Sequence, residues 1–197
     1  MMEENNFTEK ESLQLINEMI GKAKKSHIEK GIASILWGAL IFFCSMYSWA
    51  ESYFKFDGGD PWILTLVALV IQTFFAIKDG KKRNFKSYEA DVLGSVWSAF
   101  GICMFILIIY SNKNPSGGAI ISLFMLLYGY PTFVTGRVTK FTPMIYGGII
   151  CWIFCIISIY SPYAIDNLLM AGCGLAAWLI PGIILWVGYK KNRAANV

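Results

Sequence analysis

The sequence is poor in charged residues and has almost no histidine. Asp, Glu, Lys and Arg make up 15% of its 197 residues, whereas a typical soluble domain carries about 25%. The single histidine is His27. Six long stretches contain no charged residue or histidine: Ile32–Ala50, Pro61–Ile77, Val92–Tyr110, Gly117–Gly136, Phe141–Ile165 and Asn167–Tyr189. Uncharged stretches of this length are typical of membrane-spanning segments.

The length and continuity of these stretches predict helices rather than strands. A helix needs about 20 apolar residues to cross the hydrocarbon core, whereas barrel strands alternate apolar and polar residues over about 10 positions. We therefore predict an all-α integral membrane bundle of six transmembrane helices, paired as three short-looped hairpins. The predicted divisions are a cytoplasmic N-terminal segment (1–30), a transmembrane domain (31–190) and a cytoplasmic tail (191–197).

The positive charges predict the orientation. If the N-terminus is cytoplasmic, only Lys55 and Lys113 of the 17 Lys and Arg residues lie outside, and the other 15 lie in cytoplasmic segments. Cytoplasmic loops are enriched in Lys and Arg, so we predict that both termini are cytoplasmic. Topology alone then accounts for the net charge of +4, and we expect the lipid bilayer, not nucleic acid, as the main partner.

The six stretches lack the side chains that most intramembrane chemistry needs. Proton relays and ion paths use intramembrane acids and bases, and the sequence places Asp166 in the connection between the last two spans. These absences disfavour a proton-coupled antiporter, a carrier of charged substrates and an intramembrane protease. Cys151 and Cys155 lie one helical turn apart, but no predicted span contains a His, Asp or Glu that could complete a metal site. We predict no enzymatic activity, no cofactor and no metal.

The N-terminal segment Phe7–Lys30 is predicted to form an amphipathic helix. Apolar residues recur along it at helical spacing, and the stripe consists of Leu13, Ile16, Met19, Ile20 and Ala23. Three interpretations remain open. The stripe packs on the cytoplasmic face of the bundle, lies in the membrane interface, or binds a partner helix.

Two prolines within apolar stretches indicate kinks in the fourth and sixth spans, because proline removes a backbone hydrogen bond and clashes with the preceding turn. Broken helices in matching positions can frame a transport site near the centre of the membrane. The sequence also places one amide deep in a span. The candidate solute path is Gln72, Tyr128, Tyr130, Pro131, Thr132 and Pro181.

Small residues recur four positions apart in four spans. The pairs and runs are Ser34 and Gly38; Gly94 and Ser98; Gly147, Cys151 and Cys155; and Gly172 and Ala176. Such faces allow close helix packing, either within the chain or between two copies. The odd-numbered spans also share an aromatic-small-small pattern beginning at Trp37, Trp97 and Tyr146, which is compatible with a triplicated hairpin.

The segments Leu126–Arg137 and Tyr146–Trp152, together with the helix from Glu11 to Lys30, resemble an uncharacterised group of six-span bacterial inner-membrane proteins. The resemblance implies an inner-membrane location and no particular chemistry. The leading functional hypothesis is a non-enzymatic regulatory or adaptor component that contacts a partner through its N-terminal helix. The alternative is a carrier or channel for a small neutral solute, with a path near the fourth and sixth spans.

Overall fold

A computed structural model describes residues 9–80, 88–113 and 119–194. Within these ranges, only the backbone is described for residues 9–30, 75–80, 88, 189 and 192–194. Every element within these residues is helical. The elements are α1 (Glu9–Phe54), α2 (Ile63–Gly80), α3 (Tyr88–Lys113), α4 (Ile120–Val138), α5 (Thr142–Ile159), α6 (Tyr163–Gly174), a π-helical turn η1 (Leu175–Leu179) and α7 (Ile180–Ala194). The prediction of an all-α fold is confirmed.

Four described segments are long and apolar enough to cross a membrane: Gly31–Phe54, Glu89–Lys113, Thr142–Ile159 and Tyr163–Gly188. They indicate a membrane protein. The other two predicted spans coincide with α2 and α4. The described apolar part of α2 is only Ile63–Phe74, and the second half of α4 contains tyrosines, a proline, threonines and Arg137. Six crossings therefore stay a prediction.

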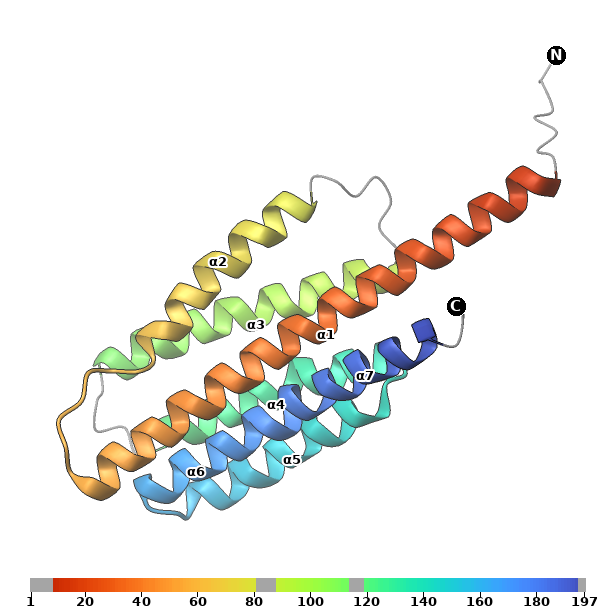
Figure 1. The fold of residues 1–197 in the computed structure, drawn as a ribbon. Coiled ribbons are helices and arrows are strands. Elements are labelled where there is room, and N and C mark those ends of the chain that lie inside the picture. The colour runs from red at the N-terminus through yellow and green to blue at the C-terminus, as the bar shows by residue number, and fades with distance from the viewer. Residues whose placement is uncertain (1–8, 81–87, 114–118, 195–197) are drawn as a thin grey trace.

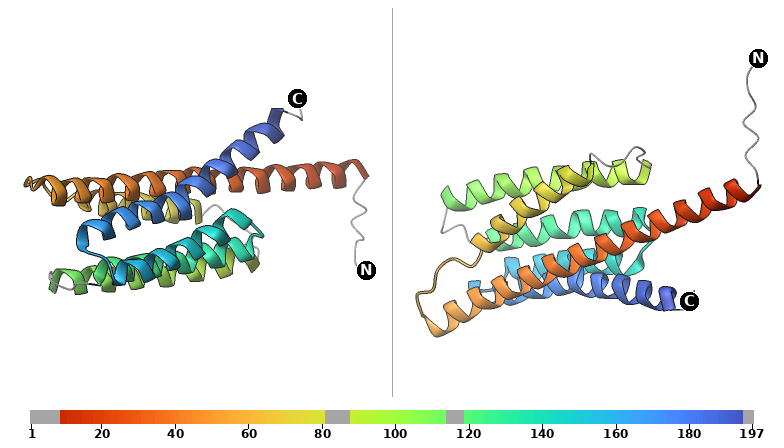
Figure 2. Two further views of the ribbon diagram at one scale, coloured as in Figure 1. Left: turned by 90° about the horizontal axis from the view of Figure 1, so that it is seen from below. Right: turned by 45° about the horizontal axis from the view of Figure 1, so that its top comes forward.

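Helices α1 to α5 run alternately in opposite directions, and α6, η1 and α7 together form one further span that runs antiparallel to α5 (Figures 1 and 2). The start of α1 and the end of α7 therefore lie at the same end of the bundle. The packed centre consists of α1, α4, α5, α6, η1 and α7. Helix α3 packs on α4, whereas α2 contacts only the edge of α1 among the described elements. Most apolar side chains of α2 are exposed, including Val70 at 70%, as expected for a helix surrounded by lipid.

Helix α1 is 46 residues long and has no break between its N-terminal part and the candidate span. The span accounts for 24 of these residues, which leaves 22 that precede it in the same helix. Figure 1 shows this N-terminal part extending beyond the other helices. The predicted cytoplasmic helix and the first span therefore share one continuous backbone.

Small residues bring the central helices close together. A Cβ placed on Gly38 of α1 would lie 2.4 Å from the backbone nitrogen of Leu179. A Cβ on Gly147 of α5 would lie 2.4 Å from the carbonyl oxygen of Ala176. Helices in lipid have no hydrophobic drive to associate, so van der Waals contact at such close approach contributes to holding them together. Three of the predicted small-residue faces, those of Gly38, Gly147 and Gly172 with Ala176, therefore pack within the chain.

The turn between α4 and α5 is fixed by a helix-ending motif. The N–H of Phe141 donates to the carbonyl of Gly136, and the N–H of Lys140 donates to that of Arg137. This is the Schellman arrangement, which places one residue in the left-handed region. That residue is Lys140, with φ 54°, rather than the glycine usually found there.

Candidate functional site

The sixth predicted span is interrupted where the sequence predicts a kink. The backbone N–H of Ile180 bonds to the carbonyl of Leu175, five residues earlier, so Leu175–Leu179 forms a π-helical turn. Proline cannot donate to the residue four positions before it, and its ring clashes with that carbonyl. Pro181 thus explains the widened turn, and π-turns inside α-helices are frequent at functional sites. Helix α4, in contrast, runs unbroken through Pro131.

The π-turn carries Trp178 into a group of rings that we call the aromatic cluster: Trp37, Trp97, Phe100, Tyr128 and Trp178. The Trp178 ring centroid lies 4.8 Å from that of Tyr128 and 6.2–6.5 Å from those of the other three. Aromatic pairs in this range contribute about 0.5–1.5 kcal/mol beyond the burial of their area. The cluster therefore ties α1, α3, α4 and η1 together.

All three indole N–H groups of the aromatic cluster donate to side-chain oxygens. Trp178 donates to the hydroxyl of Thr132 at 3.0 Å, and Trp97 donates to that of Thr135 at 3.2 Å. Trp37 donates to the amide oxygen of Gln72. The Thr132 hydroxyl in turn donates to the carbonyl of Tyr128 at 2.8 Å. The three indole donors of the cluster are thus satisfied by neighbouring side chains within an apolar bundle.

The structure brings together most of the predicted solute-path residues. Tyr128 and Thr132 belong to this network and are buried, and Pro131 and Pro181 are fully buried beside it. Gln72 reaches the network from α2 through Trp37. Tyr130 does not join them. Its side chain is 51% exposed and lies on the other side of α4.

A second polar network was missed by the sequence analysis. Asp166 is 3% exposed, and its carboxylate accepts a hydrogen bond of 2.8 Å from the Ser158 hydroxyl. The hydroxyls of Ser158 and Ser122 lie 2.8 Å apart, and both side chains are buried. The network thus joins α4, α5 and α6 through three side chains.

The prediction that Asp166 lies in the connection between the last two spans is wrong. The chain turns at residues 160–162, and α6 starts at Tyr163 directly after Pro162. Asp166 therefore lies in the first turn of α6, inside the candidate span Tyr163–Gly188. A carboxylate near a helix N-terminus is stabilised by the helix dipole. Since a buried intramembrane acid is a functional candidate in its own right, the absence of such an acid no longer argues against proton-coupled transport.

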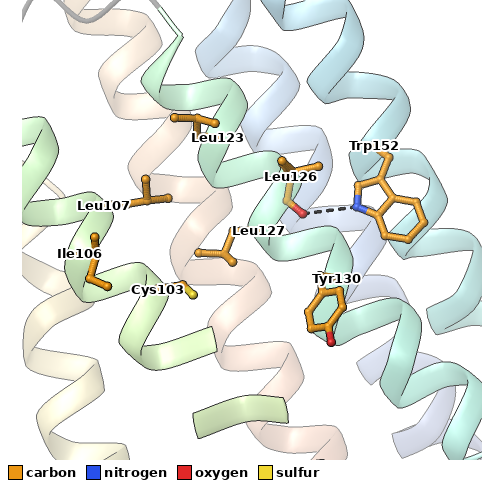
Figure 3. A pocket seen from close by; sticks show the side chains of 8 residues that line it. All are labelled: Cys103, Ile106, Leu107, Leu123, Leu126, Leu127, Tyr130 and Trp152. Carbon is orange, nitrogen blue, oxygen red and sulfur yellow. Dashed lines mark hydrogen bonds between the residues drawn. The ribbon is translucent and has the colours of Figure 1, made fainter. Parts of the chain in front are cut away.

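An apolar groove runs between α3 and α4, with α5 at its edge (Figure 3). Its volume is about 450 Å³, and Tyr130 forms part of its wall. The Trp152 indole N–H beside it donates to the carbonyl of Leu126 at 3.3 Å. The groove is separate from the aromatic cluster, so the structure divides the predicted path residues between two places.

The remaining predicted features lie partly outside the described side chains. The backbone of the apolar stripe is helical, but the side chains of Leu13, Ile16, Met19, Ile20 and Ala23 are outside the description. A Cβ placed on Gly94 would meet no atom of the described residues within 4 Å, so no described helix packs on α3 at this position. In the described part of the chain, no three His, Cys, Asp or Glu side chains gather as a metal site would require.

No protein-family model matches this sequence, and comparisons with curated proteins and with solved structures give no match either. The inferred resemblance to a group of six-span proteins therefore receives no support from them. Arguments about function accordingly rest on the geometry of this chain.

Proposed function

We propose that the chain is a non-enzymatic, six-span inner-membrane protein that serves as an adaptor or regulatory component, with its cytoplasmic contact surface on residues 9–30 of α1. The observation that carries the proposal is the unbroken course of α1 from Glu9 to Phe54. A partner bound to the N-terminal part would hold the same helix that packs in the bundle. Binding and bundle geometry would then be coupled directly.

The six-span topology is supported by the lengths of the two helices beyond the four candidate spans. Helix α2 has 18 residues and α4 has 19, which at 1.5 Å per residue gives lengths of about 27–29 Å. This is close to the hydrocarbon thickness of about 30 Å. The antiparallel order and the 15 Lys and Arg residues assigned to one side support cytoplasmic termini.

The contacts of α1 within the bundle support coupling between its two parts. Gly31, the first residue of the candidate span, packs against Gly182 and Leu185 of α7. Two helical turns further along α1, Gly38 packs against Leu179 of the π-turn. Both contacts involve backbone atoms of the sixth span, so a rigid-body tilt of α1 would alter its packing against η1 and α7.

A pull-down from native membranes in mild detergent tests the adaptor proposal. The full-length chain is compared with a chain lacking residues 2–30 and with the variant Ile16→Gln/Ile20→Gln, which makes the stripe polar. The matched control Gln14→Ala/Glu18→Gln changes the opposite side of the same helix. We expect a stoichiometric partner that is lost with the first two changes and kept with the control. A chain that purifies alone in every form would contradict the proposal.

The alternative is a carrier or channel for a small neutral solute beside the fourth and sixth spans. The observation that favours it is the π-turn before Pro181, which turns Trp178 toward Thr132. A widened turn at the centre of the bundle would provide a hinge for opening and closing a solute path. Solute flux into proteoliposomes, reduced by Pro181→Ala, would support this function. Absence of flux across a broad panel of neutral solutes would count against it.

A further inference from the structure

The groove between α3 and α4 lies at membrane depth. Its α3 wall includes Cys103 and Ile106, which lie close to the middle of the candidate span Glu89–Lys113. Its α4 wall includes Leu123 and Leu127, between the start and the middle of that helix. The groove therefore extends from the centre of the hydrocarbon core toward one membrane surface.

The wall of the groove offers almost nothing to a polar ligand. Its lining is aliphatic apart from one thiol and two aromatic residues. The Trp152 indole N–H is already bonded to the Leu126 carbonyl, so the Tyr130 hydroxyl is the remaining strong polar group. A water-soluble solute would lose its hydration here without replacement hydrogen bonds. The chemistry of the wall selects a hydrocarbon.

The size of the groove selects a single chain. If a methylene takes about the 30 Å³ that a water molecule occupies, a volume of about 450 Å³ holds on the order of 15 methylenes. We propose that the α3–α4 groove is a binding site for one acyl chain of a membrane phospholipid.

Photo-crosslinking with a phospholipid that carries a diazirine in its acyl chain tests the site in the full-length protein, reconstituted in bilayers. Cys103→Trp fills the groove, whereas Ile102→Trp places the same ring on the neighbouring position of α3, whose side chain is 64% exposed. We expect crosslinks concentrated on groove residues, a several-fold loss with Cys103→Trp, and no loss with Ile102→Trp. Crosslinks spread equally over all exposed apolar faces, or unchanged in Cys103→Trp, would overturn the proposal.

Discussion

Replacing Thr132 by valine should destabilise the bundle by removing the acceptor of the Trp178 indole. The two side chains are nearly isosteric, so packing changes little. Thr132 is 0% exposed and Trp178 is 5% exposed, so the orphaned N–H finds no water. An unsatisfied buried donor costs about 1–3 kcal/mol, whereas hydrogen bonds between membrane helices average about 0.6 and reach about 1.7 kcal/mol. We expect Thr132→Val to lower the free energy of unfolding by about 1–2 kcal/mol.

A double-mutant cycle separates this hydrogen bond from packing effects. Trp178→Phe removes the donor, so Thr132→Val should cost less in that background than in the native chain. The difference is the coupling energy, expected at about 0.6–1.7 kcal/mol. Unfolding by titration of mixed micelles with a denaturing detergent, followed by circular dichroism, measures all four variants. A coupling energy of zero would refute the assignment of this bond as part of the stability of the site.

Three further predictions use the same unfolding measurement. Gly147→Leu should lower the free energy of unfolding by about 1–3 kcal/mol or more, because the new side chain would meet the backbone of Ala176. Gly94→Leu should leave it unchanged, because no described atom lies within 4 Å of its Cβ. Equal effects of the two substitutions would contradict the packing. Ser158→Ala should cost about 1–3 kcal/mol because it leaves the buried Asp166 without its hydroxyl donor, and an unchanged midpoint would argue against the network. Lys140→Gly should be neutral or stabilise by up to about 1 kcal/mol because φ is 54° there, and a marked loss would contradict the Schellman turn.

The apolar stretches predicted the helices well because lipid leaves the backbone few alternatives. The boundary before the last span was misplaced for a physical reason. The prediction ended the span at the charge of Asp166. The chain turns instead at Pro162, and the Asp166 carboxylate is buried with Ser158 as its partner. A rule based on charge alone cannot foresee a partner on another helix. The same limit applies to any buried polar network.

The candidate site could be predicted only in part. Pro181 and Thr132 were selected from their residue types, but Trp178 was not, because a tryptophan in an apolar run looks the same whether it faces lipid or a neighbouring helix. The aromatic-small-small pattern was a usable signal. Trp37 and Trp97, its first two members, both reach the aromatic cluster, whereas Tyr146 is 63% exposed. The rotation of each helix about its own axis decides which of these aromatic side chains face the cluster. That rotation cannot be read from a single sequence.

Because the backbone of α1 is continuous, a small tilt of the helix within the membrane produces a larger displacement at its N-terminal end. The 22 residues before Gly31 extend about 33 Å at 1.5 Å per residue. A tilt of about 10° about Gly31 would displace the far end by about 6 Å, slightly more than one helical turn of 5.4 Å. The same tilt moves atoms close to the pivot by only a fraction of that distance. A small tilt within the membrane would thus become a sideways displacement of several ångströms at the surface where a partner would bind.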